Sequence, residues 1–333
     1  MDLGRIQMKA WLTALVYVCA LNCYPTYANT WWTFTFDNDV FVGRDQGYTN
    51  GLFLARHEGS ANTVYNPSPK PGWLSSGMTW SLPSSAPLFT LNSYTLGQMM
   101  VTPQDLSRET PDPNDLPYSG TLLFTNTYFT AQENMADKIS VSIGMVGPSC
   151  GAEQTQKMMH KMTDSTEPKG WDSQLGDEFV FQVERGRIWR HWRDKQKRRT
   201  DLVYSLEGSA GLIKVAVTAS AFLRWGTKLE TTYITPAMTS TRTSNPVATQ
   251  GGWFFFAGLK ATYLMHSTQI DGNTFRNSIS TDLDHCQLGT SAGLTYSWRS
   301  ISLALALEQL NLCENRYQND SEYGTFTIGW KQN

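Results

Sequence analysis

Large apolar residues alternate with small or polar residues over several stretches of the chain, most regularly near its C-terminal end. Residues 288–298 and 301–307 show the pattern most clearly, and residues 325–330 and 31–36 repeat it with aromatic residues. A period of two is typical of a β-strand whose two faces differ in chemistry. Each of these predicted strands has one face of large apolar side chains and one face of small or polar side chains.

Two fold classes fit such strands. A soluble secreted β-sandwich packs large apolar side chains into its interior, whereas a membrane barrel turns them toward lipid and can keep small polar side chains inside. The second arrangement fits better, and 12 candidate strands also give the even number that closed bacterial barrels require. We predict an all-β fold, a 12-stranded antiparallel transmembrane β-barrel, with strands at about 31–39, 48–57, 91–101, 118–130, 138–147, 177–188, 201–211, 213–225, 252–266, 286–298, 300–311 and 321–330.

Composition and the N-terminal residues support an exported barrel. The chain has 12 Trp, 14 Tyr and 15 Phe but a mean hydropathy of −0.36. Two basic residues precede an apolar stretch at 10–21, and Thr26–Ala28 is a plausible cleavage site, which together predict a secretory signal peptide. We assign residues 1–28 to this peptide and residues 29–333 to one barrel. The net charge of −2 gives no reason to expect a nucleic-acid partner.

An even-stranded barrel with both termini in the periplasm fixes which segments lie at the outer rim. The end of the first strand, Thr49 at the start of the second, the loop near Arg108 and the loop at 148–176 all fall on the outer side. Residues 58–90 and 226–251 fall on the periplasmic side. Both are long for periplasmic turns, which are short in most such barrels.

The aromatic face of the first strand ends in a polar cluster. Continuing the alternation past Phe36 places Asn38 on the aromatic face, between Asp37 and Asp39. Polar groups on a lipid-facing surface are costly and are expected to have a function. The alternative is a turn that ends the strand, because Asp and Asn favour turns, and the same alternative applies to Thr49–Gly51.

A helix is predicted within the outer loop, at residues 152–162, because this stretch lacks Gly and Pro and is rich in helix-forming residues. One face carries Glu153, Gln156 and His160, and the opposite face carries three methionines. Gln156 and His160 are four residues apart, so their side chains can meet. The alternative is a surface amphipathic helix with an incidental histidine.

Five sequence blocks make the interpretation specific: FDNDVF, GYTNGLFLA, GQMMVTPQDL, VGPSCGAEQTQKMMH and PKGWDSQL. In order and spacing, over essentially the whole mature chain, they resemble the outer-membrane lipid A 3′-O-deacylases, the LpxR family. The resemblance implies a 12-stranded barrel of the bacterial outer membrane and a calcium-dependent hydrolase. Its substrate would be lipid A, or lipopolysaccharide, from which it would remove the 3′-linked acyloxyacyl group in the outer leaflet.

The resemblance also implies catalytic roles. His160 matches the catalytic histidine of the family and would act as the general base on a water molecule, which requires an imidazole within hydrogen-bond reach of that water. Gln156 would orient it. Asn38 and Thr49 match further catalytic-site residues, and the site is expected at the barrel wall, facing lipid near the outer surface.

Metal and substrate contacts follow from the resemblance less completely. Asp39, with Asn38, is the expected calcium ligand because calcium prefers oxygen donors. Arg108 is the nearest basic residue to a substrate-binding lysine that the family can place in the same loop. A glutamate that one branch of the family carries six residues after the histidine is absent, since Thr166 holds that place and Glu167 follows.

Two other functions remain open from sequence. One is an outer-membrane phospholipase with a serine nucleophile, for which the best candidate segment is His57–Ser60. The other is a porin or adhesin without catalysis, which would leave the polar cluster and the loop helix without a purpose. We expect a monomer surrounded by outer-membrane lipid.

The run at 185–199 is strongly basic. It could bind lipid phosphates. Because the topology puts it on the periplasmic side, away from the predicted site, we favour a solvated turn with Trp189 and Trp192 at the membrane interface.

Cysteine positions predict one disulfide. The mature chain has Cys150, Cys286 and Cys313, in a compartment that is oxidising. A two-residue turn at Arg299–Ser300 would place Cys286 opposite Cys313, within bridging reach. Cys150 would then remain a free thiol, and a three-residue turn would offset the pair by one residue.

Overall fold

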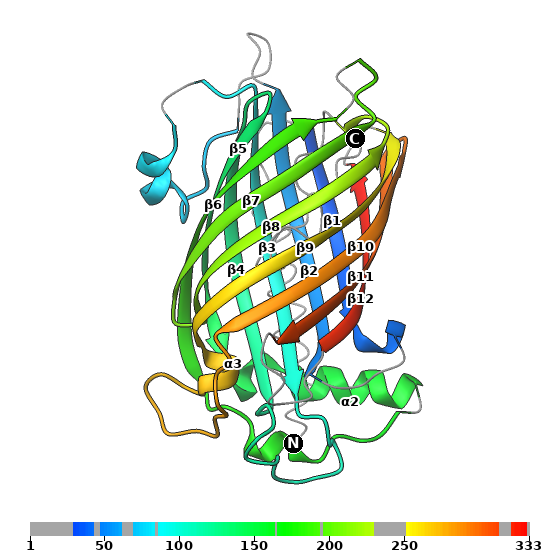
Figure 1. Ribbon diagram of the computed structural model, residues 1–333. Helices are drawn as coiled ribbons and strands as arrows, with labels where there is room; N and C mark the ends of the chain where they lie inside the picture. Colours follow the sequence, from blue (N-terminus) through cyan, green and yellow to red (C-terminus); the bar gives the residue numbers. More distant parts are fainter. Residues whose placement is uncertain are drawn as a thin grey trace.

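The fold is a closed antiparallel β-barrel. The computed structural model describes residues 29–42, 47–61, 69–83, 86–163, 165–193, 196–229, 251–312 and 321–331. Within them twelve strands close in the order β1-β12-β11-β10-β9-β8-β7-β6-β5-β4-β3-β2, so each strand pairs with its sequence neighbours and β1 pairs with β12 (Figure 1). The strands are β1 (Asn29–Asn38), β2 (Gly47–Ala61), β3 (Phe89–Thr102), β4 (Ser119–Ala131), β5 (Met135–Val146), β6 (Glu178–Trp192), β7 (Thr200–Gly211), β8 (Lys214–Gly226), β9 (Gly252–Ser267), β10 (Cys286–Trp298), β11 (Ile301–Leu312) and β12 (Ser321–Lys331).

The predicted fold class and all twelve predicted strands are confirmed. Most predicted boundaries lie within a few residues of the observed ones. The largest differences at a C-terminal end are in β2, which continues to Ala61 instead of ending near residue 57, and in β6, which continues to Trp192 instead of ending near residue 188. The first half of the basic run at 185–199 therefore belongs to a strand and not to a solvated turn, and this part of the sequence interpretation was wrong. The predicted signal peptide, 1–28, lies outside the described residues.

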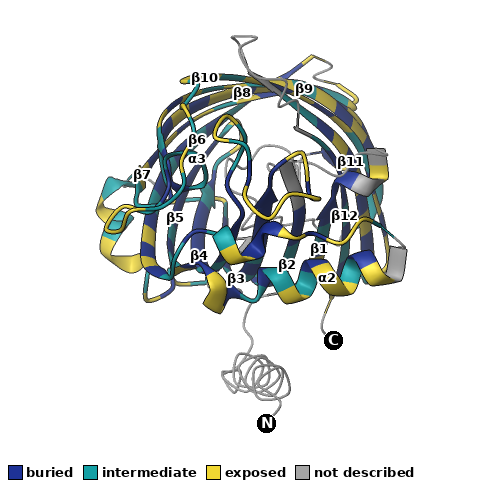
Figure 2. Ribbon diagram, turned by 90° about the horizontal axis from the view of Figure 1, so that it is seen from below, coloured by how far each residue is buried: buried dark blue, intermediate teal, exposed yellow. Residues whose placement is uncertain are grey.

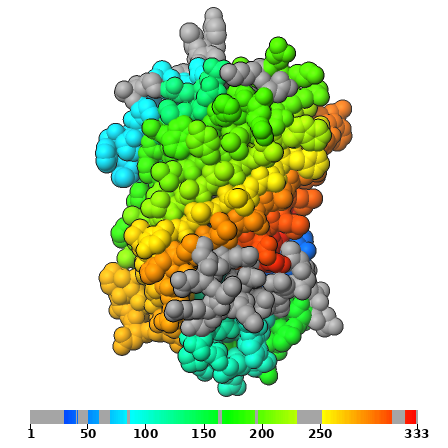
Figure 3. Space-filling model, in the orientation of Figure 1, coloured from blue at the N-terminus to red at the C-terminus, as the bar shows by residue number. Residues whose placement is uncertain are grey.

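The two faces of the strands are distributed as a membrane barrel requires. Along β11 the large side chains of Ile301, Leu303 and Leu305 are exposed, whereas Ser302 and Ala304 between them are buried. This is the reverse of a water-soluble sandwich, and it suits an outer surface in contact with lipid. Figure 3 shows the outer surface from β6 to β9, where the strands run as diagonal bands from green to yellow.

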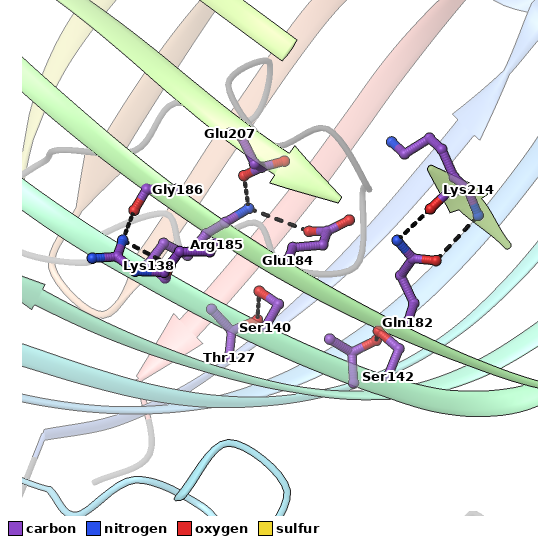
Figure 4. Close-up of polar contacts among 11 residues, drawn as sticks. Thr127, Lys138, Ser140, Ser142, Gln182, Glu184, Arg185, Gly186, Glu207 and Lys214 are labelled. Atoms are coloured by element: carbon purple, nitrogen blue, oxygen red, sulfur yellow. Dashed lines mark hydrogen bonds and ion pairs between the residues drawn. The ribbon is translucent and has the colours of Figure 1, made fainter. Parts of the chain in front are cut away.

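Polar side chains fill much of the barrel interior. Lys138 of β5 forms ion pairs with Glu184 of β6 (3.5 Å) and with Glu207 of β7 (Figure 4). Arg224 of β8 donates to Asp201 of β7 from Nε and Nη2, at 2.9 and 2.6 Å. All five side chains are buried, and charges are stable there only because they are paired across neighbouring strands.

Short helices mark the two ends of the barrel. At one end lie η1 (Asp39–Val42) and α2 (Ala152–Thr163), both in segments predicted for the outer rim, together with α3 (Thr268–Asp271). The C-terminal end of β12 lies at the other end (Figure 1). η2 (Ser76–Ser81) belongs to the long segment between β2 and β3, near that second end. No helix in the described ranges is long and apolar enough to cross a membrane.

The hairpin between β10 and β11 has the predicted register. Trp298 pairs with Ile301 across a two-residue turn, and Gln287 pairs with Leu312 at the other end of the ladder. Cys286 is disulfide-bonded, whereas Cys150 is a buried free thiol. Cys313 lies outside the described residues, so its pairing with Cys286 stays a prediction.

Candidate active site

A row of cross-strand partners on the outward face connects the polar end of β1 with α2. Asn38 pairs with Asn50 of β2, Asn50 with Met100 of β3, and Met100 with Gly120 of β4. Asn38 continues the outward face of Phe36, as the sequence predicted, and cross-strand partners share a face. Yet the first three side chains of the row are buried, so this part of the lipid-facing wall is covered.

A β-bulge shapes this row at its second position. The β2–β3 register shifts between Tyr48 and Asn50, which leaves Thr49 as the extra residue. Bulges of this kind redirect side chains near functional sites. The predicted site residue Thr49 thus lies at the outer rim, although its side chain is outside the described part of the structure. Asn50, which the sequence analysis did not single out as a site residue, takes the buried position beside Asn38. Its Oδ1 has no hydrogen-bond partner within the described ranges.

The two carboxylates beside Asn38 are fully buried as well. Asp37 is the last inward-facing residue before Asn38, and Asp39 is the first residue of η1. A simple strand-ending turn does not describe this segment fully, because η1 folds back over the outside of β12. Phe41 of η1 packs edge-on against Phe36, with ring centroids 5.7 Å apart. It also lies so close to Gly324 of β12 that any larger residue there would clash.

α2 is fastened to the outer wall at its N-terminal end. The Gln98 side chain of β3 donates to the carbonyl of Cys150 (2.6 Å) and accepts from the Thr155 hydroxyl (3.0 Å). A Cβ on Gly120 would lie only 2.5 Å from Cβ of Ala152, so glycine permits the close approach. Figures 1 and 2 both show α2 running along the outer rim on the side of β1, β2 and β3.

The helix buries its polar face and not its methionine face. Gln156 is 1% exposed and His160 is 8% exposed, whereas Met158 is 57% exposed. Glu153, predicted on the same face as Gln156 and His160, is only partly buried and accepts a hydrogen bond from Lys157 (2.8 Å), which raises the Lys157 pKa. The interpretation of α2 as an ordinary surface helix with an incidental histidine does not fit this burial.

Gln156 is held by a residue that the sequence analysis did not single out. Trp171, in the PKGWDSQL block, donates from its indole Nε1 to Gln156 Oε1 (2.7 Å) and packs against Tyr118, with ring centroids 5.0 Å apart. This bond fixes which end of the amide faces the tryptophan. Gln156 Nε2 then points elsewhere, and it has no hydrogen-bond partner in the described part of the chain. The block itself was the available signal for Trp171.

The orientation of His160 follows from the segment that comes after α2. Its Nδ1 lies 2.5 Å from the carbonyl oxygen of Thr166. A carbonyl only accepts, so Nδ1 carries the proton and Nε2 is the basic nitrogen of the neutral ring. Thr166 stands where one branch of the family has glutamate, and it supplies a backbone carbonyl to the histidine.

Arg108 lies in the β3–β4 loop at the same rim, but its side chain is about half exposed and pairs with Asp112 (3.2 Å). The loop is joined to the segment after α2 by a hydrogen bond from Lys169 N to Leu106 O (3.0 Å). The structure therefore brings Arg108 to the outer rim without bringing it into the buried cluster. Its role in substrate binding stays a prediction.

The histidine suggested for a serine phospholipase lies on the wrong side of the wall. His57 is fully buried on the inward face, where Nε2 bonds Thr33 Oγ1 (2.8 Å) and Nδ1 bonds Ser93 Oγ (2.7 Å). Its ring also stacks on Trp31, at 5.3 Å between centroids. Both ring nitrogens are used within the barrel interior, so this histidine cannot activate a nucleophile at the outer wall.

These observations define the protein first as a transmembrane β-barrel with a covered polar site on the outward side of its wall. The family model for "Outer membrane protein LpxR" matches residues 12–332, so the chain belongs to the LpxR family, whose members lie in the bacterial outer membrane. Among solved structures, it is similar to LpxR from Salmonella typhimurium, with a TM-score of 0.69 and 15% identity, covering 90% of this chain and 99% of that chain. At that identity the likeness establishes the fold.

Other barrels match more weakly. The translocator domain of the autotransporter NalP from Neisseria meningitidis has a TM-score of 0.40 and 8% identity, covering 99% of this chain and 98% of that chain. The KdgM porin has a TM-score of 0.39 and 6% identity, covering 91% and 99%. Neither bears on the site. Comparison with curated protein sequences gives no match.

Proposed function

We propose that the protein is a calcium-dependent lipid A 3′-O-deacylase, a carboxylic ester hydrolase that removes the 3′-linked acyloxyacyl group in the outer leaflet. The observation that carries the proposal is the burial of Asn38, Asn50, Gln156 and His160 on the outward side of the barrel, at the rim that α2 covers. Buried polar groups at a lipid-facing surface are costly without a ligand. A lipid that diffuses within the leaflet can reach this wall sideways.

The residues at the end of β1 suit a calcium ion. Calcium prefers hard oxygen donors, including carboxylate, amide and backbone oxygens. Asp39, with Asn38, would hold the ion, and the buried Oδ1 of Asn50 is a further oxygen without a hydrogen-bond partner in the described ranges. No group of three His, Cys, Asp or Glu side chains gathers there among the described residues, so amide oxygens must complete the ligand set. When bound, calcium would polarise the ester carbonyl and stabilise the oxyanion.

His160 performs the proton transfers in this proposal. Its Nε2 removes a proton from a water molecule while the water oxygen attacks the ester carbonyl carbon. The tetrahedral adduct then breaks the bond between that carbon and the 3′ oxygen of the sugar. His160 returns the proton to this oxygen, which gives a free acyloxyacyl acid and a 3′ hydroxyl group.

Two other groups prepare this step. Gln156 lies one helical turn before His160 and, held by Trp171, donates from Nε2 to the oxygen of the attacking water. The Thr166 carbonyl keeps the proton on Nδ1, so that Nε2 carries the lone pair that acts as the base. Both contacts hold the water and His160 in one geometry for attack on the ester, and such positioning raises the rate of hydrolysis.

Mass spectrometry of lipid A from cells that make the protein tests the proposal. Cells with the wild-type chain should lose the mass of the 3′ acyloxyacyl group, and fragmentation should place the loss on the 3′ position. Cells with equal amounts of a His160→Ala variant should keep fully acylated lipid A. Accumulation of lysophospholipid with intact lipid A would point to the phospholipase instead, and unchanged lipids of both kinds would point to the porin or adhesin.

A further inference from the structure

A second polar site lies on the outward wall, at the periplasmic end. Arg185 and Arg187 of β6 pair across strands with Ile139 and Asp137 of β5. They belong to the same face as the exposed Phe179, so their side chains leave the barrel toward the membrane. The function proposed above makes no use of them.

The position of the arginines along the wall corresponds to a membrane boundary. Arg185 lies in one cross-strand row with Ile139, Tyr128 of β4 and Asn92 of β3. The next outward positions toward the outer rim include Val183 and Val141, which begin the apolar band. Trp189, which follows the arginines along β6, stacks on Tyr204 of β7 at 5.4 Å between centroids. Aromatic residues of this kind mark the depth of lipid headgroups.

The site carries an excess of positive charge. Both guanidinium groups converge on a single oxygen, Oδ1 of Asp137, with Arg187 Nε at 3.0 Å. Asp137 is almost fully buried, whereas the Arg187 side chain is 39% exposed. Two permanent cations thus share one carboxylate, which leaves a net charge of +1 at the surface. That surface faces the headgroup region of the periplasmic leaflet, where phosphate is the abundant anion.

The segment before β3 completes the site. It is fixed to the wall by Gly72 N, which donates to Asn92 Oδ1 (3.1 Å), and by the Ser75 hydroxyl, which donates to Asn126 Oδ1 (2.7 Å). Arg185 Nη2 donates to the carbonyl of Ser81, at the end of η2 (3.2 Å). Figure 1 shows this cyan segment standing out sideways from the barrel.

Exposed tryptophans on this segment indicate contact with membrane. Trp73 is 66% exposed and Trp80 is 79% exposed. In water such exposure would be unfavourable, but tryptophan is stable at the level of lipid headgroups and esters. The segment and the two arginines therefore lie at the same interface.

We propose that Arg185 and Arg187 bind the phosphate of a glycerophospholipid of the periplasmic leaflet, with Trp80 and Trp189 beside its glycerol and ester groups. The planar guanidinium group of Arg187 contacts Asp137 through Nε, so its terminal nitrogens face outward and suit phosphate oxygens. The terminal nitrogens of Arg185 already donate to Asp137 and to the carbonyls of Ser81, Lys138 and Gly186, so Arg185 contributes its positive charge. The occupant is a phospholipid and not lipid A, because this end of the barrel is opposite to α2. The bound lipid would seal the wall around η2 and fix the depth of the barrel in the membrane.

Native mass spectrometry of the full mature chain in detergent can test this. The protein is incubated with phosphatidylglycerol or with diacylglycerol of the same acyl chains, which lacks only the phosphate-containing headgroup. The wild type should retain one phosphatidylglycerol and no diacylglycerol. The variant R185Q/R187Q should bind phosphatidylglycerol about 10- to 30-fold more weakly, as expected for the loss of two basic contacts at a membrane surface.

The matched control is R198Q/R299Q, which removes two exposed cations at the same end of the barrel without touching Asp137. Because R185Q/R187Q leaves Asp137 buried without its partners, the triple variant with D137N is measured as well, and heat-modified electrophoretic mobility verifies folding. Equal retention of diacylglycerol, equal retention by all folded variants, or displacement of the lipid by inorganic phosphate alone would overturn the proposal. None of these readouts depends on deacylase activity.

Discussion

One cross-strand row runs along the outward wall and changes its chemistry where β12 meets β1. From Gly324 in one direction it continues through Leu307, Ala292, Ala257 and Leu223, all apolar. In the other direction it continues through the residues of the candidate site: Asn38, Asn50, Met100 and Gly120. The row therefore has an apolar half and a polar half, and the two halves have different surroundings.

The two halves differ in whether other parts of the protein cover them. The apolar half forms an open groove of about 730 Å³, with Phe41 at the β12 end and Trp225 among its lining residues. The polar half is buried, and α2 packs over its β3–β4 end. Amide groups are tolerated on a lipid-facing wall only where protein replaces lipid as their neighbour. The covered half is therefore where chemistry with a lipid headgroup can occur, next to a groove that suits acyl chains.

Removing calcium should produce the largest change in activity at the covered half of the row. We expect chelation to reduce lipid A deacylation below detection, and Asp39→Asn to raise the calcium concentration needed for half-maximal rate by roughly 10–100-fold. A calcium titration of purified protein on lipid A in mixed micelles measures both. Full activity after verified removal of the metal would contradict the assigned role.

Displacing α2 from the barrel wall should have the next largest effect. Gly120→Val places side-chain atoms where Ala152 of α2 already lies, so we expect α2 to shift and turnover to fall by roughly 10–100-fold while the barrel stays folded. Gly208→Val in β7 is the matched control, since a Cβ there meets nothing within 4 Å. Turnover assays of the two variants decide the point, and equal rates would show that the position of α2 is unimportant.

An amide placed in the uncovered half should cost stability without adding function. Ala292→Asn puts an amide on the lipid-facing side of β10 with no covering helix, and we expect a loss of about 1–3 kcal/mol in unfolding free energy. Ala292→Leu should cost less than 1 kcal/mol. Urea unfolding in lipid vesicles measures the difference. If the asparagine variant were as stable as the leucine variant, an amide on the lipid-facing wall would not need a covering helix, and this part of the account would be wrong.

The thiols should show the smallest effect. Burial raises the pKa of Cys150 to about 12, so iodoacetamide at pH 8 should leave the folded protein unmodified and its activity unchanged. After unfolding without reductant, peptide mapping should find Cys150 alone alkylated. Alkylation of Cys286 and Cys313 to the same extent would show that the predicted bridge between them is wrong.

Much of the fold could be predicted because a two-residue period was enough to mark it. The alternation at 301–307 gave both the strand and its outward face, and the short turn at Arg299–Ser300 gave the register. β6 was predicted too short for a physical reason. The prediction ended β6 near residue 188, inside the basic run at 185–199, because that run was taken for a turn. Arg185 and Arg187 lie on the lipid-facing side of the strand, where a membrane interface tolerates them.

The candidate site could be predicted only in part. His160 and Gln156 followed from helical spacing and from the resemblance, whereas their partners Thr166 and Trp171 depend on how the chain folds back after α2. Asn50 was missed because a β-bulge at Thr49 decides which residue stands beside Asn38. Alternation alone does not reveal a bulge.

The most direct test of the central claim is the deacylation rate of purified His160→Ala on lipid A at saturating calcium, beside the wild type and Met158→Ala. Met158 is on the exposed face of the same helix, so its variant controls for changes in α2 itself. With His160 as the general base, the His160 variant should be slower by about 10²–10⁴-fold, and the Met158 variant should keep its rate within about 2-fold of the wild type, since surface substitutions have small effects. A folded His160→Ala protein that released the acyloxyacyl acid at the wild-type rate would contradict the account.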